Sequence, residues 1–183
     1  MKQFILFLTL SRLLFAPVIF VGLIVFNNFF LTFILFLIVS ITDYFDGWLA
    51  RKYKLTSDFG AILDPIADKI LLLFSLFAIT LYLQDPYIGL ISIIILAREF
   101  WVSALREFAS KNQINDATTV TYLAKIKTSV QFLTLFLYFG SFLMNLEYGV
   151  FVANIMLFIS MLITLWTGLD LSLIHISEPT RPY

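Results

Sequence analysis

Six long apolar runs separated by short polar breaks dominate the hydropathy pattern of this chain. The runs cover roughly residues 4–26, 29–50, 60–83, 87–108, 122–144 and 148–170. Each approaches the length of about 20 residues that an α-helix needs to cross the hydrocarbon core of a bilayer. No internal repeat or low-complexity linker divides the runs. The pattern therefore predicts an all-α membrane protein with six transmembrane helices in a single domain, residues 1–171.

Lysine and arginine are distributed unequally between the two ends of the predicted helices. They gather at the N-terminus, in the second connection and around the fourth, at Lys2, Arg51, Lys52, Lys54, Arg106, Lys111, Lys125 and Lys127. The three other breaks contain neither residue. Because basic residues concentrate in cytoplasmic loops, we expect both termini to be cytoplasmic and the protein to lie in the inner membrane of the cell.

Residues 172–183 form a polar tail that departs from this pattern. The tail carries the only histidine of the chain, His175. A single histidine in such a tail is more often solvated than a metal ligand. A non-native origin is one explanation of the composition of the tail, and we exclude it from the functional interpretation.

Composition supports a membrane protein and excludes several functions. Hydrophobic residues make up 61% of the chain and charged residues 13%, whereas soluble domains are nearer one half and one quarter. The absence of cysteine excludes disulfides and thiolate metal sites. The net charge of zero argues against nucleic acid as a partner.

Four aspartates interrupt the apolar pattern in the segment "DYFDGWLARKYKLTSDFGAILDPIAD", residues 43–68. At about 100° per residue, two helical stripes result, one of Asp43, Asp46, Gly47 and Ala50 and one of Gly60, Asp64 and Asp68. The connection between the two helices is short. We therefore expect the helices to be antiparallel neighbours whose stripes face each other, near the cytoplasmic interface.

Four facing carboxylates repel one another unless they are protonated or neutralised by cations. Oxygen ligands without cysteine or a nearby histidine favour Mg²⁺, Mn²⁺ or Ca²⁺ over zinc. Two such ions, bound by Asp43, Asp46, Asp64 and Asp68, would form a clamp for a displacement at phosphorus. The small residues Gly47, Ala50 and Gly60 leave space for a diphosphate. The sequence thus predicts a polar metal site near the cytoplasmic interface.

Two other interpretations of the aspartates stay open. The first is that they only form ion pairs with the basic residues Arg12, Arg51, Lys69 and Arg98. Alternatively, an acidic layer can mark the pathway of a cation transporter. The outer halves of the predicted spans contain almost no polar residue, which disfavours transport. The two phased stripes with small residues between them favour a binding site over structural ion pairs.

The same segment resembles the CDP-alcohol phosphatidyltransferase family. It fits, without a gap, the motif DxxDGxxARx8GxxxDxxxD of that family, whose defined positions are occupied by Asp43, Asp46, Gly47, Ala50, Arg51, Gly60, Asp64 and Asp68. Eight fixed residues at fixed spacing are a highly specific signal. The resemblance implies six transmembrane helices, a homodimer, and a cytoplasm-facing site with two divalent cations, Mg²⁺ or Mn²⁺.

The resemblance also implies roles for the residues of the motif. Asp43, Asp46 and Asp64 would be metal ligands. Asp68 would contact the second metal ion and take the proton of the acceptor hydroxyl. The residues that would hold the CDP group are Asp43, Gly47, Ala50, Arg51 and Gly60.

Similarity outside the motif concerns residues 8–12, 95–109 and 123–128, "LTLSR", "ILAREFWVSALREFA" and "LAKIKT". These segments are similar to family members that use CDP-diacylglycerol and sn-glycerol 3-phosphate within a membrane. The residues that we expect at the acceptor phosphate are Arg106, Lys125, Lys127 and Arg12. For Arg12 an ion pair with an aspartate is the alternative, and Arg98 and Glu99 are expected to pair with each other. Serine, inositol phosphate or a lipid alcohol remain alternative acceptors.

Overall fold

The computed structural model describes the backbone of residues 2–53, 58–111 and 122–177, and the side chains of residues 8–43, 45, 63–108 and 126–169. These residues form six helices, α1 (Lys2–Ile24), α2 (Phe29–Tyr53), α3 (Asp58–Leu83), α4 (Pro86–Lys111), α5 (Tyr122–Met144) and α6 (Glu147–Ser177). The predicted all-α fold with six helices is confirmed. Helix α6 continues through the first residues of the predicted polar tail, and residues 178–183 lie outside the described part.

Four of the helices contain segments that are long and apolar enough to cross a membrane. These segments are Leu63–Leu83, Pro86–Phe108, Ile126–Met144 and Glu147–Leu169. The described parts of α1 and α2 are shorter apolar segments, Leu8–Ile24 and Phe29–Asp43. The protein is therefore a multi-pass membrane protein.

Three short turns join α1 to α2, α3 to α4 and α5 to α6. Each contains a residue in the left-handed backbone region, Asn27 (φ 47°), Gln84 (φ 52°) and Asn145 (φ 52°). Such a residue ends a helix, and asparagine tolerates the conformation better than most other residues. The polar breaks in the sequence thus coincide with backbone that stops one helix and reverses the chain.

Side chains in two of these turns also begin the next helix. Asn28 Oδ1 accepts a hydrogen bond from the amide of Leu31 at 2.9 Å, and Asp85 Oδ1 accepts one from the amide of Tyr87 at 2.8 Å. These are N-cap interactions, which satisfy backbone N–H groups that have no partner within the helix. They explain why α2 and α4 begin where they do.

The helices pack in a closed order in which α1 separates α2 from α3. Contacts run from α1 to α2, α5, α6, α4, α3 and back to α1, and α3 also touches α5. Within the described residues α2 and α3 make no direct helix contact, because α1 lies between them. The segment that joins the two helices lies outside the described residues, so the expectation that they are neighbours there stays a prediction. Helical phase identifies the polar face of each helix but does not determine which helix packs against it.

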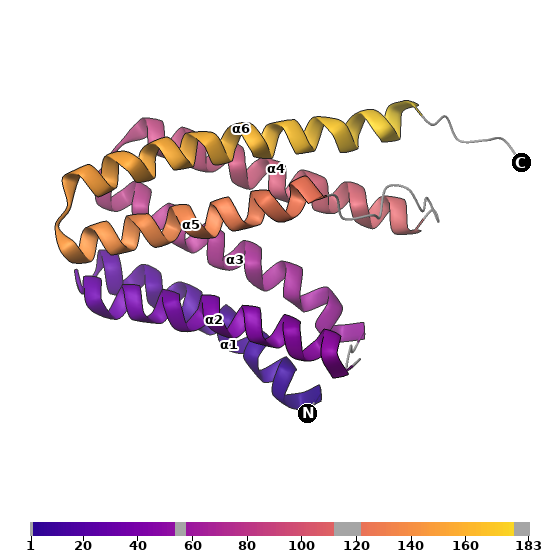
Figure 1. Ribbon diagram of the computed structural model, residues 1–183, viewed down its shortest axis with the longest axis horizontal. Helices are drawn as coiled ribbons and strands as arrows, with labels where there is room; N and C mark the ends of the chain where they lie inside the picture. Colours follow the sequence, from indigo (N-terminus) through magenta and orange to yellow (C-terminus); the bar gives the residue numbers. More distant parts are fainter. Residues whose placement is uncertain (1, 54–57, 112–121, 178–183) are drawn as a thin grey trace, which may run out of the picture.

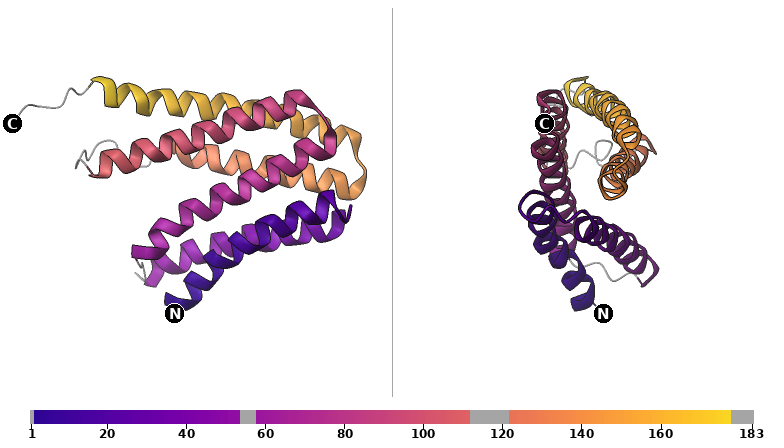
Figure 2. Two further views of the ribbon diagram at one scale, coloured as in Figure 1. Left: turned by 180° about the vertical axis from the view of Figure 1, so that it is seen from behind. Right: turned by 90° about the vertical axis from the view of Figure 1, so that its left-hand side faces the viewer.

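The bundle is narrow at one end and wide at the other. The helices converge at the end with the three short turns, and they spread apart toward the end where α1 begins and α6 ends (Figures 1 and 2). At the narrow end the rings of Phe29, Tyr82 and Phe142 pack together, with centroids 4.7–6.5 Å apart. Aromatic packing between α2, α3 and α5 therefore holds this end together.

The turn between α3 and α4 offers a test of the helix ends. A left-handed backbone costs a residue such as Gln84 roughly 1–2 kcal/mol, whereas glycine adopts it freely. We expect Gln84→Gly to stabilise the protein by about 1 kcal/mol. The thermal unfolding midpoint in one detergent measures this change. Asn27→Gly is the matched control, with a smaller gain because asparagine already tolerates the conformation. An unchanged or lower midpoint for Gln84→Gly would contradict the prediction.

Candidate active site

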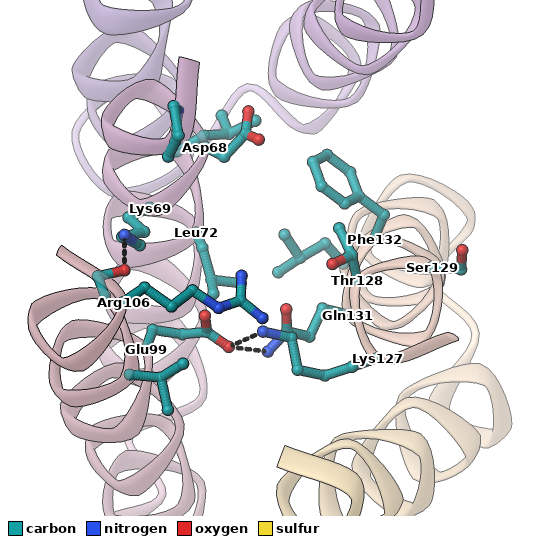
Figure 3. Close-up of a pocket in the computed structure, with 15 residues that line it drawn as sticks. Asp68, Lys69, Leu72, Glu99, Arg106, Lys127, Thr128, Ser129, Gln131 and Phe132 are labelled. Carbon is teal, nitrogen blue, oxygen red and sulfur yellow. Dashed lines mark hydrogen bonds and ion pairs between the residues drawn. The ribbon is translucent and has the colours of Figure 1, made fainter. Parts of the chain in front are cut away.

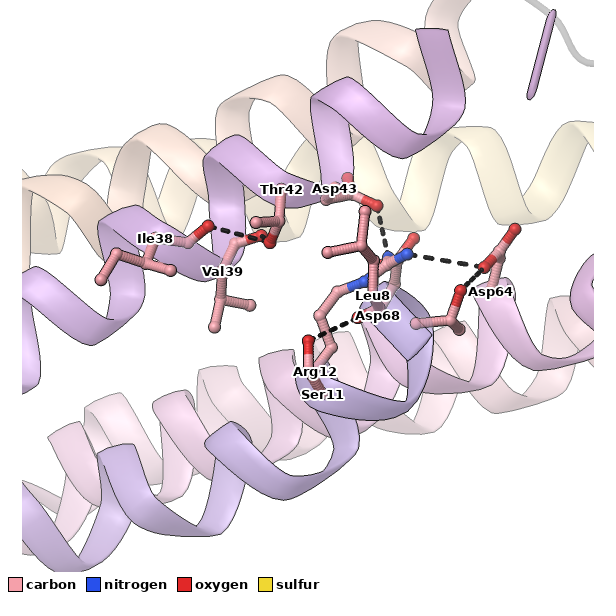
Figure 4. A network of polar contacts seen from close by, with 10 residues as sticks. Leu8, Ser11, Arg12, Ile38, Val39, Thr42, Asp43, Asp64 and Asp68 are labelled. Atoms are coloured by element: carbon pink, nitrogen blue, oxygen red, sulfur yellow. Dashed lines mark hydrogen bonds and ion pairs between the residues drawn. The ribbon is translucent and has the colours of Figure 1, made fainter. Parts of the chain in front are cut away.

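A fully buried arginine joins three aspartates from two other helices. Arg12 on α1 is 0% exposed, and its Nη1 donates hydrogen bonds to Asp43 Oδ1 on α2 and, at 2.8 Å, to Asp68 Oδ1 on α3. Its Nη2 lies 3.5 Å from Asp64 Oδ1 (Figure 4). A buried guanidinium is tolerated only when it is paired. We call Asp43, Asp64 and Asp68 the aspartate cluster.

The spacing of residues along α1 and α3 explains this convergence. Asp64 and Asp68 are one helical turn apart, so both side chains lie on one face of α3. Thr9 and Arg12 are likewise three residues apart on α1. Thr9 Oγ1 donates a hydrogen bond of 2.7 Å to Asp64 Oδ1, so that α1 holds this carboxylate through two side chains. Of the two alternatives for Arg12, pairing with aspartate is the one that the structure contains.

The chemistry of the aspartate cluster suits a hard cation. The carboxylates of Asp43, Asp64 and Asp68 are 32%, 44% and 37% exposed, so a ligand can reach them although Arg12 is buried. No group of three or more acidic or histidine side chains in the described part is arranged as a metal site. Arg12 lies between the three carboxylates instead. Carboxylate oxygens without cysteine or histidine nonetheless fit Mg²⁺ or Mn²⁺.

Several residues predicted for the site lie outside the described side chains. Their backbones are in α2, α3 and α5, and they are Asp46, Gly47, Ala50, Arg51, Gly60 and Lys125. Their roles in holding metal, CDP or the acceptor stay predictions.

A cavity of about 460 Å³ lies between α3, α4 and α5, next to the aspartate cluster (Figure 3). The charged residues that line it are Asp68, Lys69, Glu99, Arg106 and Lys127. Because three of these side chains are cationic and two are acidic, we call it the basic cavity. Two of the residues predicted at the acceptor phosphate, Arg106 and Lys127, therefore face one space, whereas Arg12 pairs with the aspartates.

The three cations of the basic cavity differ in their partners. Lys127 Nζ lies 2.6 Å from Glu99 Oε1, and Lys69 donates a hydrogen bond to Ser103 Oγ. Arg106 forms no ion pair with a described carboxylate, and its buried Nε has no hydrogen-bond partner in the part of the chain described. Arg106 is thus the cation best able to receive an anion.

Sequence reasoning did not assign Lys69, Ser103 or Gln131 to the site. Lys69 directly follows Asp68, so the sequence places it in the same polar layer and suggests an ion-pair partner, but not a residue that lines a cavity. Gln131 donates a hydrogen bond of 3.1 Å to Glu99 Oε1 from a helix 32 positions further along the chain. The spacing of Lys127 and Gln131, one turn apart on α5, was the available signal.

Asp68 belongs to both parts of the site. Its Oδ1 accepts the hydrogen bond from Arg12 in the aspartate cluster, and the residue also lines the basic cavity. No described group donates a hydrogen bond to the other carboxylate oxygen. That oxygen is available to a ligand in the cavity.

Comparisons with known proteins agree with this geometry. The chain is 38% identical to the CDP-diacylglycerol–glycerol-3-phosphate 3-phosphatidyltransferase of Wigglesworthia glossinidia brevipalpis, over 85% of the chain and 88% of that protein. For the proteins of the same name from Rickettsia typhi and Haemophilus influenzae, the identities are 39% and 36%. The alignment with the Rickettsia typhi protein covers 92% of the chain and 94% of that protein. The alignment with the Haemophilus influenzae protein covers 88% of the chain and 86% of that protein.

The family model for CDP-alcohol phosphatidyltransferases matches residues 6–166. The match includes α2 and α3 with all four aspartates, and the residues of α4 and α5 that line the basic cavity. The chain belongs to the CDP-alcohol phosphatidyltransferase family.

Proposed function

We propose that this enzyme transfers the phosphatidyl group of CDP-diacylglycerol to sn-glycerol 3-phosphate, giving phosphatidylglycerophosphate and CMP. The position of Asp68 carries the proposal, because it connects the aspartate cluster to the basic cavity. Relatives that bear the name of this activity align along most of the chain. Family membership gives no support to the alternative of a cation transporter.

Each part of the site serves one substrate. The hydroxyl oxygen of the acceptor attacks the phosphorus that carries diacylglycerol, and the bond from that phosphorus to CMP breaks. Asp68 takes the proton of the hydroxyl, while Arg12 holds one of its oxygens in place. Arg106 and Lys127, together with Lys125, bind the acceptor phosphate. Arginine can grip a phosphate with two hydrogen bonds, whereas lysine acts as a point charge.

We propose that two divalent cations, Mg²⁺ or Mn²⁺, take part. Asp43, Asp46, Asp64 and Asp68 are their ligands, and the donor set of hard oxygens supports this assignment. Bound cations would neutralise the diphosphate of CDP-diacylglycerol and stabilise charge on the leaving CMP. The motif residues Gly47, Ala50, Arg51 and Gly60, with Asp43, hold the CDP group.

The proposed topology places the chemistry at the cytoplasmic face of the inner membrane. All six helices span the bilayer with both termini in the cytoplasm, as the distribution of lysine and arginine indicates. The exposed aspartates support this placement, because acyl chains must stay in hydrocarbon while CMP and glycerol 3-phosphate exchange with water. A homodimer is also proposed, on the family resemblance alone.

Acceptor choice is the first test of the proposal. A dianionic acceptor needs cations beside the carboxylates, and Arg106 is the cation without a described carboxylate partner. We expect CMP release from CDP-diacylglycerol with glycerol 3-phosphate. Arg106→Ala should raise the KM for glycerol 3-phosphate roughly tenfold or more, as expected for the loss of a charged hydrogen bond. The KM for CDP-diacylglycerol should change little.

Arg106→Lys is the matched variant, because it keeps the positive charge but loses the planar guanidinium that can donate two hydrogen bonds. Its KM for glycerol 3-phosphate should lie between those of the wild type and Arg106→Ala. Turnover with serine or inositol phosphate and none with glycerol 3-phosphate would overturn the acceptor while leaving the family intact.

Metal dependence is the second test. Chelation of divalent cations should abolish CMP release, and Mg²⁺ or Mn²⁺ should restore it, because neighbouring carboxylates and a diphosphate repel without cations. Asp43→Ala and Asp64→Ala should each remove nearly all turnover, since groups that act as a unit are not additive. Asp85→Asn, at the N-cap of α4, removes an acid far from the site and should leave turnover intact. Near-normal rates in EDTA would refute metal catalysis.

The role of Asp68 as general base is the third test. Asp68→Asn keeps an oxygen that can accept the hydrogen bond from Arg12 but removes the basic carboxylate. We expect kcat to fall about 10²- to 10⁴-fold, the usual contribution of a general base, with the affinity for CDP-diacylglycerol largely retained. Steady-state kinetics and a donor-binding assay separate the two quantities. Loss of donor binding with a normal rate at saturation would instead make Asp68 a binding residue.

A further inference from the structure

An acidic side chain lines the cavity proposed for an anionic acceptor. Glu99 on α4 is 8% exposed and belongs to the lining of the basic cavity. A carboxylate in this place repels a phosphate dianion unless cations neutralise it. Its presence therefore needs a physical reason.

The contacts of Glu99 supply one. Its Oε1 lies 2.6 Å from Lys127 Nζ and accepts a hydrogen bond of 3.1 Å from Gln131 Nε2 (Figure 3). The same oxygen lies 3.6 Å from Arg98 Nη1. Lys127 and Gln131 are one turn apart on α5, so both reach the same oxygen from one helix face. Two donors and a nearby guanidinium thus hold one carboxylate oxygen in place.

This network is anchored to a third helix. Gln131 Nε2 also lies 3.4 Å from Thr164 Oγ1, and Arg98 Nη2 donates a hydrogen bond of 2.5 Å to Thr167 Oγ1, both on α6. Gly168 leaves room for Arg98, because an added Cβ would lie 2.9 Å from its Nε. Glu99 is therefore held by groups of α4 and α5 that are themselves hydrogen-bonded to α6.

Lys127 gains a defined position from this arrangement. A lysine side chain has four carbons of flexible stem and three ammonium donors. One donor direction is taken by Glu99, and the residue lines the basic cavity, where the remaining directions can meet a ligand. A lysine that is already held loses less conformational entropy when it binds phosphate.

We propose that Glu99 is a positioning residue for the acceptor: it holds Lys127 in the orientation that binds the phosphate of glycerol 3-phosphate. This inference rests on the proposed acceptor. Under this proposal, removal of the negative charge of Glu99 weakens binding of the acceptor and raises its KM. Simple repulsion between Glu99 and the acceptor predicts the opposite, a lower KM.

The test is Glu99→Gln, which keeps the shape of the side chain and removes its charge. Loss of a hydrogen bond to a charged group commonly costs about tenfold or more in binding. We expect the KM for glycerol 3-phosphate to rise about tenfold, with kcat and the KM for CDP-diacylglycerol close to wild type. In a Lys127→Met background, the same change should raise KM little further, because Glu99 acts through Lys127.

Two further variants complete the design. Thr134→Val is the matched control: it removes a buried hydroxyl of α5 that donates, within the described residues, only to the Val130 carbonyl, outside the Glu99 network and outside the cavity lining, so kinetics should stay near wild type. Glu99→Asp retains the charge and withdraws it by one methylene. It should also raise the KM, and it replaces Glu99→Gln if that variant does not fold.

The outcomes separate the alternatives. A lower KM in Glu99→Gln would mean that Glu99 only repels the acceptor, and an unchanged KM with reduced thermal stability would mean a purely structural role; both overturn the inference. Equal effects of Glu99→Gln with and without Lys127 would also overturn it. The same assay is first run on the wild-type protein. No turnover of the wild type with glycerol 3-phosphate would overturn the proposed function itself. Once that turnover is shown, the variants test only the role of Glu99.

Discussion

The pairing of a buried guanidinium with three carboxylates determines how this bundle is assembled. Arg12 is completely buried, and a charge at that depth is costly unless opposite charges meet it. Helix α1 therefore packs between α2 and α3, where Asp43, Asp64 and Asp68 can reach it. The same cation offsets the mutual repulsion of the aspartates. One interaction thus both orders three helices and gathers three acidic groups in one place.

The two ends of the bundle meet different physical demands. At the narrow end, aromatic rings from α2, α3 and α5 pack together and the helices turn back within a few residues. At the other end the helices spread apart (Figure 2), and polar side chains replace the aromatic contacts. Apolar packing that needs no water holds the helices at one end. The aspartate cluster and the basic cavity lie toward the other end, where the proposed reaction would exchange soluble molecules with water.

The hydrophobic pattern was sufficient to predict the number and approximate limits of the helices, because each helix had to be a long apolar run. The turns followed from Asn27 and Asn145, which suit a left-handed backbone. The convergence of Asp64 and Asp68 followed from their spacing of four. The position of α1 between α2 and α3 could not be predicted from the sequence, because periodicity identifies the polar face of a helix but not the helix that packs against it. The roles of Asp46 and Lys125 remain predictions.

Contacts between distant segments were the least predictable part of the site. Glu99 and Gln131 are 32 positions apart, and the sequence patterns of α4 and α5 do not predict the hydrogen bond between them. Likewise, Lys69 and Ser103 are 34 positions apart. Such pairs depend on the relative rotation of two helices. Packing of the whole bundle sets that rotation.

The partners of the cavity cations explain how three cationic side chains can share one enclosed space. Several unpaired cations in one enclosed space would repel one another and lose hydration. Lys127 is neutralised by Glu99 and Lys69 is hydrogen-bonded to Ser103, whereas Arg106 has no carboxylate partner among the described residues. Two of the three cations are therefore satisfied by protein groups. In the proposed function, the acceptor phosphate supplies the partner that Arg106 lacks among the described carboxylates, which a neutral alcohol cannot do.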